Sequence, residues 1–319
     1  MRIAVYLPLL LSLLAPFGAR PLSERCEPRL ATWLLTASTV VLGIASTVSL
    51  GLLTVVGLIR VPQLAGLGHW SAQAAQRDDP AELSVSLIAG LLLGGAVVMA
   101  ARMLWRRART LAAAALEAAC MPARDGLVVV EDDTPDAFAI PGMPGRVVVS
   151  TGMLHTLDDS EHDVLLAHER AHLTGHHYAF VALAQIGAAA NPLLRPLATG
   201  VTYTIERWAD ERAAATTGDR TRVARSVGKA ALAARNGPAR IRGAAMGILG
   251  RRPGRRSGHR PRQAGAGPVP RRVAALLAPP LGRHPALAAA TAAVLTAATL
   301  STAEAAHDLH RLLEAVGAW

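Results

Sequence analysis

The chain has 319 residues, of which 51% are hydrophobic and only 3% aromatic. This excess of Ala, Leu and Val suits helices in lipid better than the aromatic-rich core of a soluble protein of this size. The net charge of +10 comes almost entirely from Arg. The arginines gather beside apolar runs, which argues against a nucleic-acid-binding protein. Neither Cys26 nor Cys120 has a CxxC neighbour, so zinc-finger and thioredoxin-like folds are excluded.

Four stretches are apolar over roughly the 20 residues that a helix needs to cross a bilayer. They run from about 3 to 19, 31 to 59, 83 to 105 and 285 to 300. The first also fits a cleaved signal peptide, with Arg2 before the apolar run and small residues near Ala19. We expect a mainly α-helical integral membrane protein with about four transmembrane helices. Residues 1–105 would form a three-helix membrane region, and residues 285–319 the fourth helix and a short tail.

The charges flanking these spans predict how the chain is oriented. Arginines follow the first and third spans and precede the fourth, whereas the loop after the second span carries Asp78, Asp79 and Glu82. The positive-inside rule then places the loop after the first span and the whole of 106–284 in the cytoplasm. We therefore expect a protein of the cytoplasmic membrane, embedded in the lipid bilayer, whose soluble domain faces the cytoplasm.

Residues 106–250, between the third and fourth spans, are predicted to form this cytoplasmic α+β domain. Two β-type runs, 126–130 and 146–150, are separated by turn-forming Asp, Pro and Gly residues and favour a small antiparallel ribbon. A helix should begin near Ser160, which together with Asp163 fits a capping pattern.

Residues 251–284 are predicted to form a cytoplasmic loop rich in Arg, Pro and Gly. The run RRPGRRSGHRPRQAGAGPVP has almost no apolar content, which is typical of a flexible segment. It carries no interleaved aromatic residues on which bases could stack, so we expect no nucleic-acid partner.

The segment HERAH, residues 168–172, carries the chemistry. His168 and His172 are spaced i, i+4 and so project from one helical face, which lets two imidazoles bind one Zn²⁺. Glu169 would act as general base toward a metal-activated water and then as proton donor to the leaving amine. The alternative is a solvated helix with two chance histidines. The apolar flank VLLAHERAHL and the six histidines between positions 155 and 177 favour the metal site.

A zinc site needs a third ligand, and the residues just after HERAH are poor candidates for it. In the metzincin pattern HExxHxxGxxH, Gly175 matches, but Tyr178 stands where the last histidine is required. His176 and His177 lie on the next turn, and we expect them to point away from the face shared by the first two ligands.

Glu206 is the better candidate for the third ligand. It lies far enough along the chain for a second helix, beginning after Asn191-Pro192, to return antiparallel. Asp210 is one turn further on the same face and could accept a hydrogen bond from a ligand histidine. The alternative for this ExxxD pair is an ordinary charged helix face.

Four motifs occur in an order that resembles the membrane gluzincins, namely the HtpX and CAAX prenyl protease superfamily and the related BlaR/MecR-type sensor metallopeptidases. The motifs are DAFAIPG (136–142), VVVSTGMLHTL (147–157), LLAHERAHLTGHH (165–177) and ERWADERA (206–213). The resemblance covers about residues 124–217 and implies a zincin-like domain with zinc bound by His168, His172 and Glu206.

The same resemblance implies the other roles in the site. Glu169 would be the catalytic glutamate and Asp210 a supporting residue. The strand that holds Val147, Val148 and Val149 would bind an extended substrate by backbone pairing.

The position of the zinc domain between the third and fourth spans is similar to the BlaR/MecR type. Those receptors carry an extracellular ligand-binding domain after the fourth span, whereas this sequence ends at Trp319, so we expect a peptidase without its own sensor. The expected function is hydrolysis of peptide bonds in a cytoplasmic or membrane-proximal protein, with a transcriptional repressor among the candidate substrates. The alternative is a catalytically silent membrane signalling or scaffold protein that retains a structural zinc site.

Overall fold

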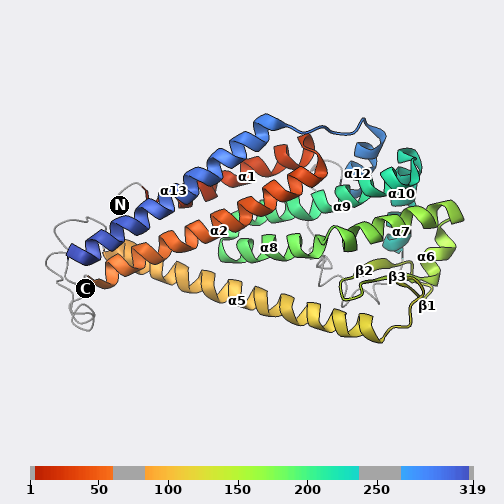
Figure 1. Ribbon diagram of the computed structural model, residues 1–319, viewed down its shortest axis with the longest axis horizontal. Helices are drawn as coiled ribbons and strands as arrows, with labels where there is room; N and C mark the ends of the chain where they lie inside the picture. The colour runs from red at the N-terminus through yellow and green to blue at the C-terminus, as the bar shows by residue number, and fades with distance from the viewer. Residues whose placement is uncertain (1–3, 60–82, 237–266, 316–319) are drawn as a thin grey trace.

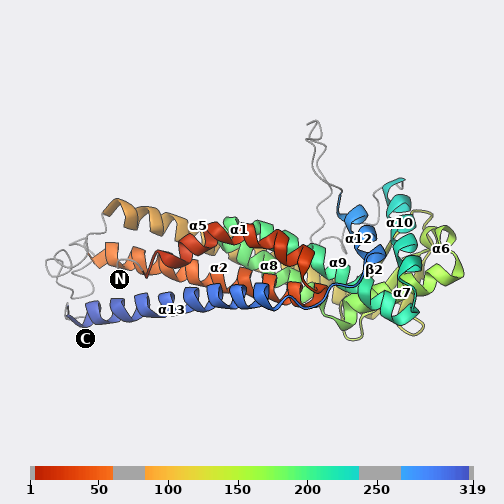
Figure 2. The ribbon, with the colours of Figure 1, turned by 90° about the horizontal axis from the view of Figure 1, so that it is seen from above.

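The computed structural model describes residues 4–59, 83–236 and 267–315. Long helices run side by side along the molecule and form a bundle (Figure 1): α1 (Leu7–Arg25), α2 (Pro28–Ile59), α5 (Leu83–Cys120) and α13 (Pro285–Ala315). One end of this bundle carries a smaller α/β portion, which projects clear of α1, α2 and α13 (Figure 2).

Among the described residues, three helical segments are long and apolar enough to cross a membrane: Pro28–Leu58, Leu83–Cys120 and Pro285–Arg311. They coincide with the second, third and fourth predicted spans. The first predicted span lies in α1, which is not among the three because its last turns carry Arg20, Glu24 and Arg25. Its outward face is nevertheless apolar, with Leu10, Leu13, Leu14 and Phe17 exposed.

A helical hairpin leaves the α/β portion and runs back along the bundle. Its arms are α8 (His177–Ala190) and α9 (Arg195–Thr217), joined by a short 3₁₀ turn over Pro192–Leu194. At the tip Leu194 is buried, and the Asn191 side-chain amide donates a hydrogen bond of 3.1 Å to Ser46 Oγ on α2. Because the second arm returns antiparallel, it carries the ERWADERA motif back toward α7 (Asp159–Thr174), as the sequence predicted.

Buried contacts anchor α9 to α1 and α2 at the start of that motif. Ile205 lies fully buried in a cluster built from α1, α2, α8 and α9. Thr32 Oγ1 on α2 donates to Thr204 Oγ1 at 2.9 Å, and Arg207 Nη1 donates to the Ser23 carbonyl of α1 at 2.9 Å. The position of Glu206 is therefore set by the packing of the bundle.

The described residues contain a three-stranded sheet in the order β1-β3-β2. Its strands are β1 (Leu127–Val130), β2 (Ala137–Ile140) and β3 (Arg146–Ser150). β1 pairs with β3 in parallel, and β2 pairs with β3 antiparallel. The predicted antiparallel ribbon of 126–130 with 146–150 was wrong, because the unpredicted strand β2 lies between them in sequence and returns the chain.

This topology also bears on the predicted substrate strand. Val147, Val148 and Val149 lie in β3, the central strand, which has a partner on each side. Its backbone groups are taken up within the sheet, so these residues do not offer the free edge that pairing with a peptide requires.

Helix α7 begins two residues earlier than the capping pattern suggested. Asp158, not Ser160, is the N-cap: its Oδ1 accepts from the Glu161 amide at 3.0 Å, and Glu161 Oε2 accepts from the Asp158 amide at 3.1 Å. The run of acidic residues allowed more than one register for this motif. Glu161 is buried and also pairs with Lys229 Nζ at 2.6 Å, which ties α10 (Arg220–Asn236) to the start of α7.

The predicted loop over 251–284 needs a correction. Residues Pro268–Leu277 form a helix, α12, which packs on α9 and α10; residues 251–266 lie outside the described part of the chain. Arg220 caps the C-terminal end of α12 by donating to three of its last carbonyl groups, those of Ala275, Leu276 and Ala278.

The hairpin can pack closely on α2 because Gly187 has no side chain. A Cβ at this position would lie 2.4 Å from the carbonyl oxygen of Thr39, whereas a Cβ at Gly94 on α5 would meet nothing within 4 Å. Gly187→Ala should lower the free energy of unfolding by about 1–3 kcal/mol. Gly94→Ala should leave it unchanged or raise it by up to about 1 kcal/mol, since Ala favours helix. Thermal unfolding in detergent measures both; equal effects would contradict this packing.

Candidate metal centre

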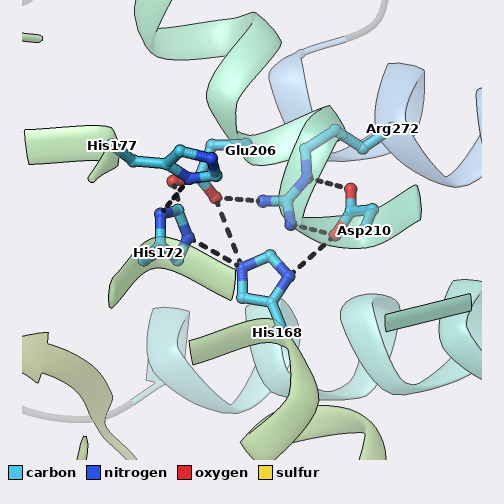
Figure 3. A network of polar contacts seen from close by, with 6 residues as sticks. All are labelled: His168, His172, His177, Glu206, Asp210 and Arg272. Carbon is cyan, nitrogen blue, oxygen red and sulfur yellow. Dashed lines mark hydrogen bonds and ion pairs between the residues drawn. The ribbon is translucent and has the colours of Figure 1, made fainter. Parts of the chain in front are cut away.

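The three predicted ligands converge between α7 and α9 (Figure 3). The Nε2 atoms of His168 and His172 lie 3.2 Å apart. Glu206 Oε1 lies 3.8 Å from Nε2 of His172, and Glu206 Oε2 lies 4.0 Å from Nε2 of His168. One ligand atom from each residue falls within 4.8 Å of the others.

This arrangement fits a tetrahedral metal ion. Two nitrogens bound to Zn²⁺ at about 2.0–2.1 Å with a tetrahedral angle would lie about 3.3 Å apart, close to the separation of the two imidazoles. The Glu206 carboxylate oxygens lie further from the two nitrogens, so this side chain would have to move toward the imidazoles to complete the site. Two imidazoles and one carboxylate also form a donor set typical of catalytic zinc sites.

Asp210 lies behind His168, as predicted. Its Oδ1 is 3.1 Å from Nδ1 of His168, and its side chain is almost fully buried. Burial acts to lower the pKa of His168, but the adjacent Asp210 carboxylate outweighs it and raises the pKa above its ordinary value. The contact keeps Nε2 of His168 directed toward the other two ligands.

Arg272, which the sequence did not single out, completes this network from α12. Its Nε and Nη2 donate to Oδ2 and Oδ1 of Asp210 at 2.8 and 2.7 Å, and its Nη1 donates to Glu206 Oε2 at 2.8 Å. Burial acts to raise the pKa of Asp210, but Arg272 outweighs it and holds that pKa well below its usual range. Arg272 thus keeps Asp210 ionised and fixes one oxygen of Glu206, while Oε1 stays directed toward His172.

Glu169 is buried beside the ligands. Burial raises its pKa to about 7, and the carboxylates of Glu206 and Asp136 act in the same direction. A carboxyl group with this pKa can both accept and donate a proton near neutral pH, which is what general acid–base catalysis requires.

The second ligand histidine has a partner that the sequence analysis misplaced. Burial lowers the pKa of His172 to about 4, so its imidazole is neutral, the form that binds a metal. His177, expected to point away, is fully buried, with its Nδ1 2.9 Å from Nδ1 of His172. His176 is exposed and adopts a left-handed backbone conformation (φ 49°) that ends the path of α7. This break turns His177 back toward His172.

The site combines a His/His/Glu group with the buried Glu169, and it lies at one end of an apolar helical bundle. These features identify the chain as a candidate membrane metallopeptidase. Residues 99–199 match the family model described as peptidase family M48. This match covers less than half of the chain; it supports the metallopeptidase class and the resemblance to the HtpX and CAAX protease type seen in the sequence. No curated protein and no solved structure matches the chain.

The family match includes α7 and α8 but ends before the second half of the site. Glu206, Asp210 and Arg272 lie beyond residue 199, so their assignment rests on the distances described above.

Two adjacent arginines of α12 allow a matched test of the buried network. Arg272→Gln leaves the buried Asp210 and the partly buried Glu206 without their counter-charge and should lower the free energy of unfolding of the metal-free protein by about 3–5 kcal/mol. Arg271 pairs with the partly exposed Glu24 at 2.8 Å, so Arg271→Gln should cost at most about 1 kcal/mol. Thermal unfolding in the presence of a chelator measures both. Equal destabilisation by the two substitutions would contradict the central role of Arg272.

Proposed function

We propose that this chain is a zinc-dependent membrane endopeptidase that hydrolyses peptide bonds in a cytoplasmic or membrane-proximal protein. The observation that carries the proposal is the convergence of His168, His172 and Glu206 beside the buried Glu169. The match to peptidase family M48 supports the metallopeptidase class.

The residues of the site have separate roles in the proposed reaction. Zinc held by the two histidines and Glu206 would polarise the scissile carbonyl and make the attacking water more acidic. Glu169 takes the proton from that water and passes it to the leaving amine, two roles that a pKa of about 7 allows. Asp210 and Arg272 hold His168 and Glu206 in place and take no part in proton transfer.

The sheet offers a place for an extended substrate on β2. Among the described strands β2 pairs only with β3, so its other edge has no strand paired with it. β2 packs on α7, and Asp136, just before it, lies close enough to Glu169 to raise its pKa. A peptide paired with this edge would run past the catalytic glutamate. β2 therefore replaces Val147, Val148 and Val149 as the proposed substrate strand.

Purified wild-type protein should contain about one zinc per chain, as expected for a three-ligand catalytic site. Glu169→Gln should keep the zinc but lose at least about 100-fold in proteolysis, because the general base is removed. Metal analysis gives the first result. Comparing the proteins of cells that express the wild type or Glu169→Gln gives the second. Undiminished cleavage by the variant would overturn the mechanism, and zinc without any cleavage by the wild type would favour a silent scaffold.

We further propose that the chain resides in the cytoplasmic membrane with its metal centre on the cytoplasmic side. Arginines flank the apolar segments on the side that leads to the α/β portion. The described ones include Arg20, Arg25, Arg106, Arg109, Arg271 and Arg283. The positive-inside rule supports this orientation.

The two cysteines provide a test of orientation. Cys120 is exposed at the end of α5 beside the α/β portion, whereas Cys26 is fully buried. A membrane-impermeant maleimide should therefore label the chain only after cells are permeabilised, and Cys120→Ser should abolish that labelling. Labelling of Cys120 in intact cells would place the metal centre on the outer side.

A further inference from the structure

Gly175 has no role in the proposed mechanism, although it matches one position of the metzincin pattern. Its φ of −83° is one that any residue adopts, so backbone freedom does not explain a glycine here. The lack of space for a side chain explains it. A Cβ would lie 2.5 Å from Nε2 and 2.7 Å from Cδ2 of His177, as well as 2.9 Å from the Ala171 carbonyl oxygen. The missing side chain makes room for the imidazole ring of His177.

That ring is held from two sides. Its Nδ1 lies 2.9 Å from Nδ1 of His172 (Figure 3). Its other face packs against the indole of Trp208 on α9, with ring centroids 4.6 Å apart. Nε2 of His177 is buried and has no hydrogen-bond partner within the described residues. The ring is therefore directed by its contact with His172 and by packing, and not by a second hydrogen bond.

The chemistry of two imidazoles fixes which nitrogen donates. His172 presents Nε2 to the other ligands, so in its neutral form the hydrogen is on Nδ1. At 2.9 Å, Nδ1 of His177 must then accept this hydrogen, and the hydrogen of His177 itself is on Nε2. A hydrogen bond to the non-ligating nitrogen sets both the tautomer and the orientation of a ligand histidine.

We propose that His177 is a positioning residue of the metal centre, which accepts the Nδ1 hydrogen of His172 and holds that ligand in place. Gly175 serves the same purpose by leaving room for its ring. The inference rests on the proposed metal site. It gives each ligand histidine its own partner on a different helix, Asp210 of α9 beside Nδ1 of His168 and His177 of α8 beside Nδ1 of His172.

Two substitutions of similar polarity separate this role from core filling. The amide oxygen of His177→Asn falls near the position of Nδ1, whereas that of His177→Gln reaches toward the position of Nε2. Zinc affinity of the full chain in detergent can be measured by competition with a chelator. We expect His177→Gln to weaken zinc binding about 10- to 100-fold and His177→Asn to stay within about five-fold of wild type. His176→Asn, at the exposed neighbouring residue, is the matched control and should bind zinc like wild type.

Gly175→Ala provides a second, independent variant. It should also weaken zinc binding about ten-fold, because its methyl group displaces the His177 ring. In the His177→Ala background no ring atom remains for that methyl group to meet, so the same substitution should have little further effect there. Any strain against the Ala171 carbonyl oxygen is present in both backgrounds and cancels in the comparison.

The outcomes distinguish this inference from the proposal on which it rests. Equal losses for His177→Asn and His177→Gln, or an equal effect of Gly175→Ala in both backgrounds, would overturn the positioning role while leaving the zinc site intact. A wild-type chain that binds no zinc would overturn both. If His177→Gln does not fold, the Gly175→Ala comparison decides alone.

Discussion

The structure depends on one buried contact, between α7 and α9, in which two carboxylates, two imidazoles and a guanidinium meet away from water. Taking these charges out of water is costly unless each has a partner. Here Asp210 and Glu206 both bind Arg272, and Asp210 also contacts His168. The rest of the fold brings these groups together: the hairpin returns α9 antiparallel beside α7, and α12 supplies the arginine.

Much of the candidate site could be predicted because its spacing is local. His168, Glu169 and His172 lie within five residues on one helix, and helical geometry alone places both imidazoles on one face. Glu206 and Asp210 followed from the need for a returning helix after Asn191-Pro192. The three candidate spans followed from apolar runs whose length matches a bilayer.

What the sequence did not reveal depends on contacts between distant residues or on a single backbone angle. Arg272 meets partners that lie 62 and 66 residues earlier in the chain, and it was one of many arginines in its segment. The parallel pairing of β1 with β3 requires the unpredicted strand β2. His177 was expected to point away because helical periodicity was extended past Gly175, whereas the left-handed conformation of His176 interrupts it.

Helix α5 runs without a break for 38 residues, from a membrane-spanning segment to the edge of the α/β portion. About two thirds of the way along it Arg107 donates to Gln185 of α8, and further along Ala114 and Ala118 pack on the sheet. Each residue of an α-helix turns the chain by about 100° and advances it by about 1.5 Å. If one residue of any type were inserted between Arg107 and Ala114, the helix could not keep both Arg107 against Gln185 and Ala114 against the sheet. The number of residues between Arg107 and Ala114 therefore matters more than their identity, because it sets both the distance and the angle between the two contacts.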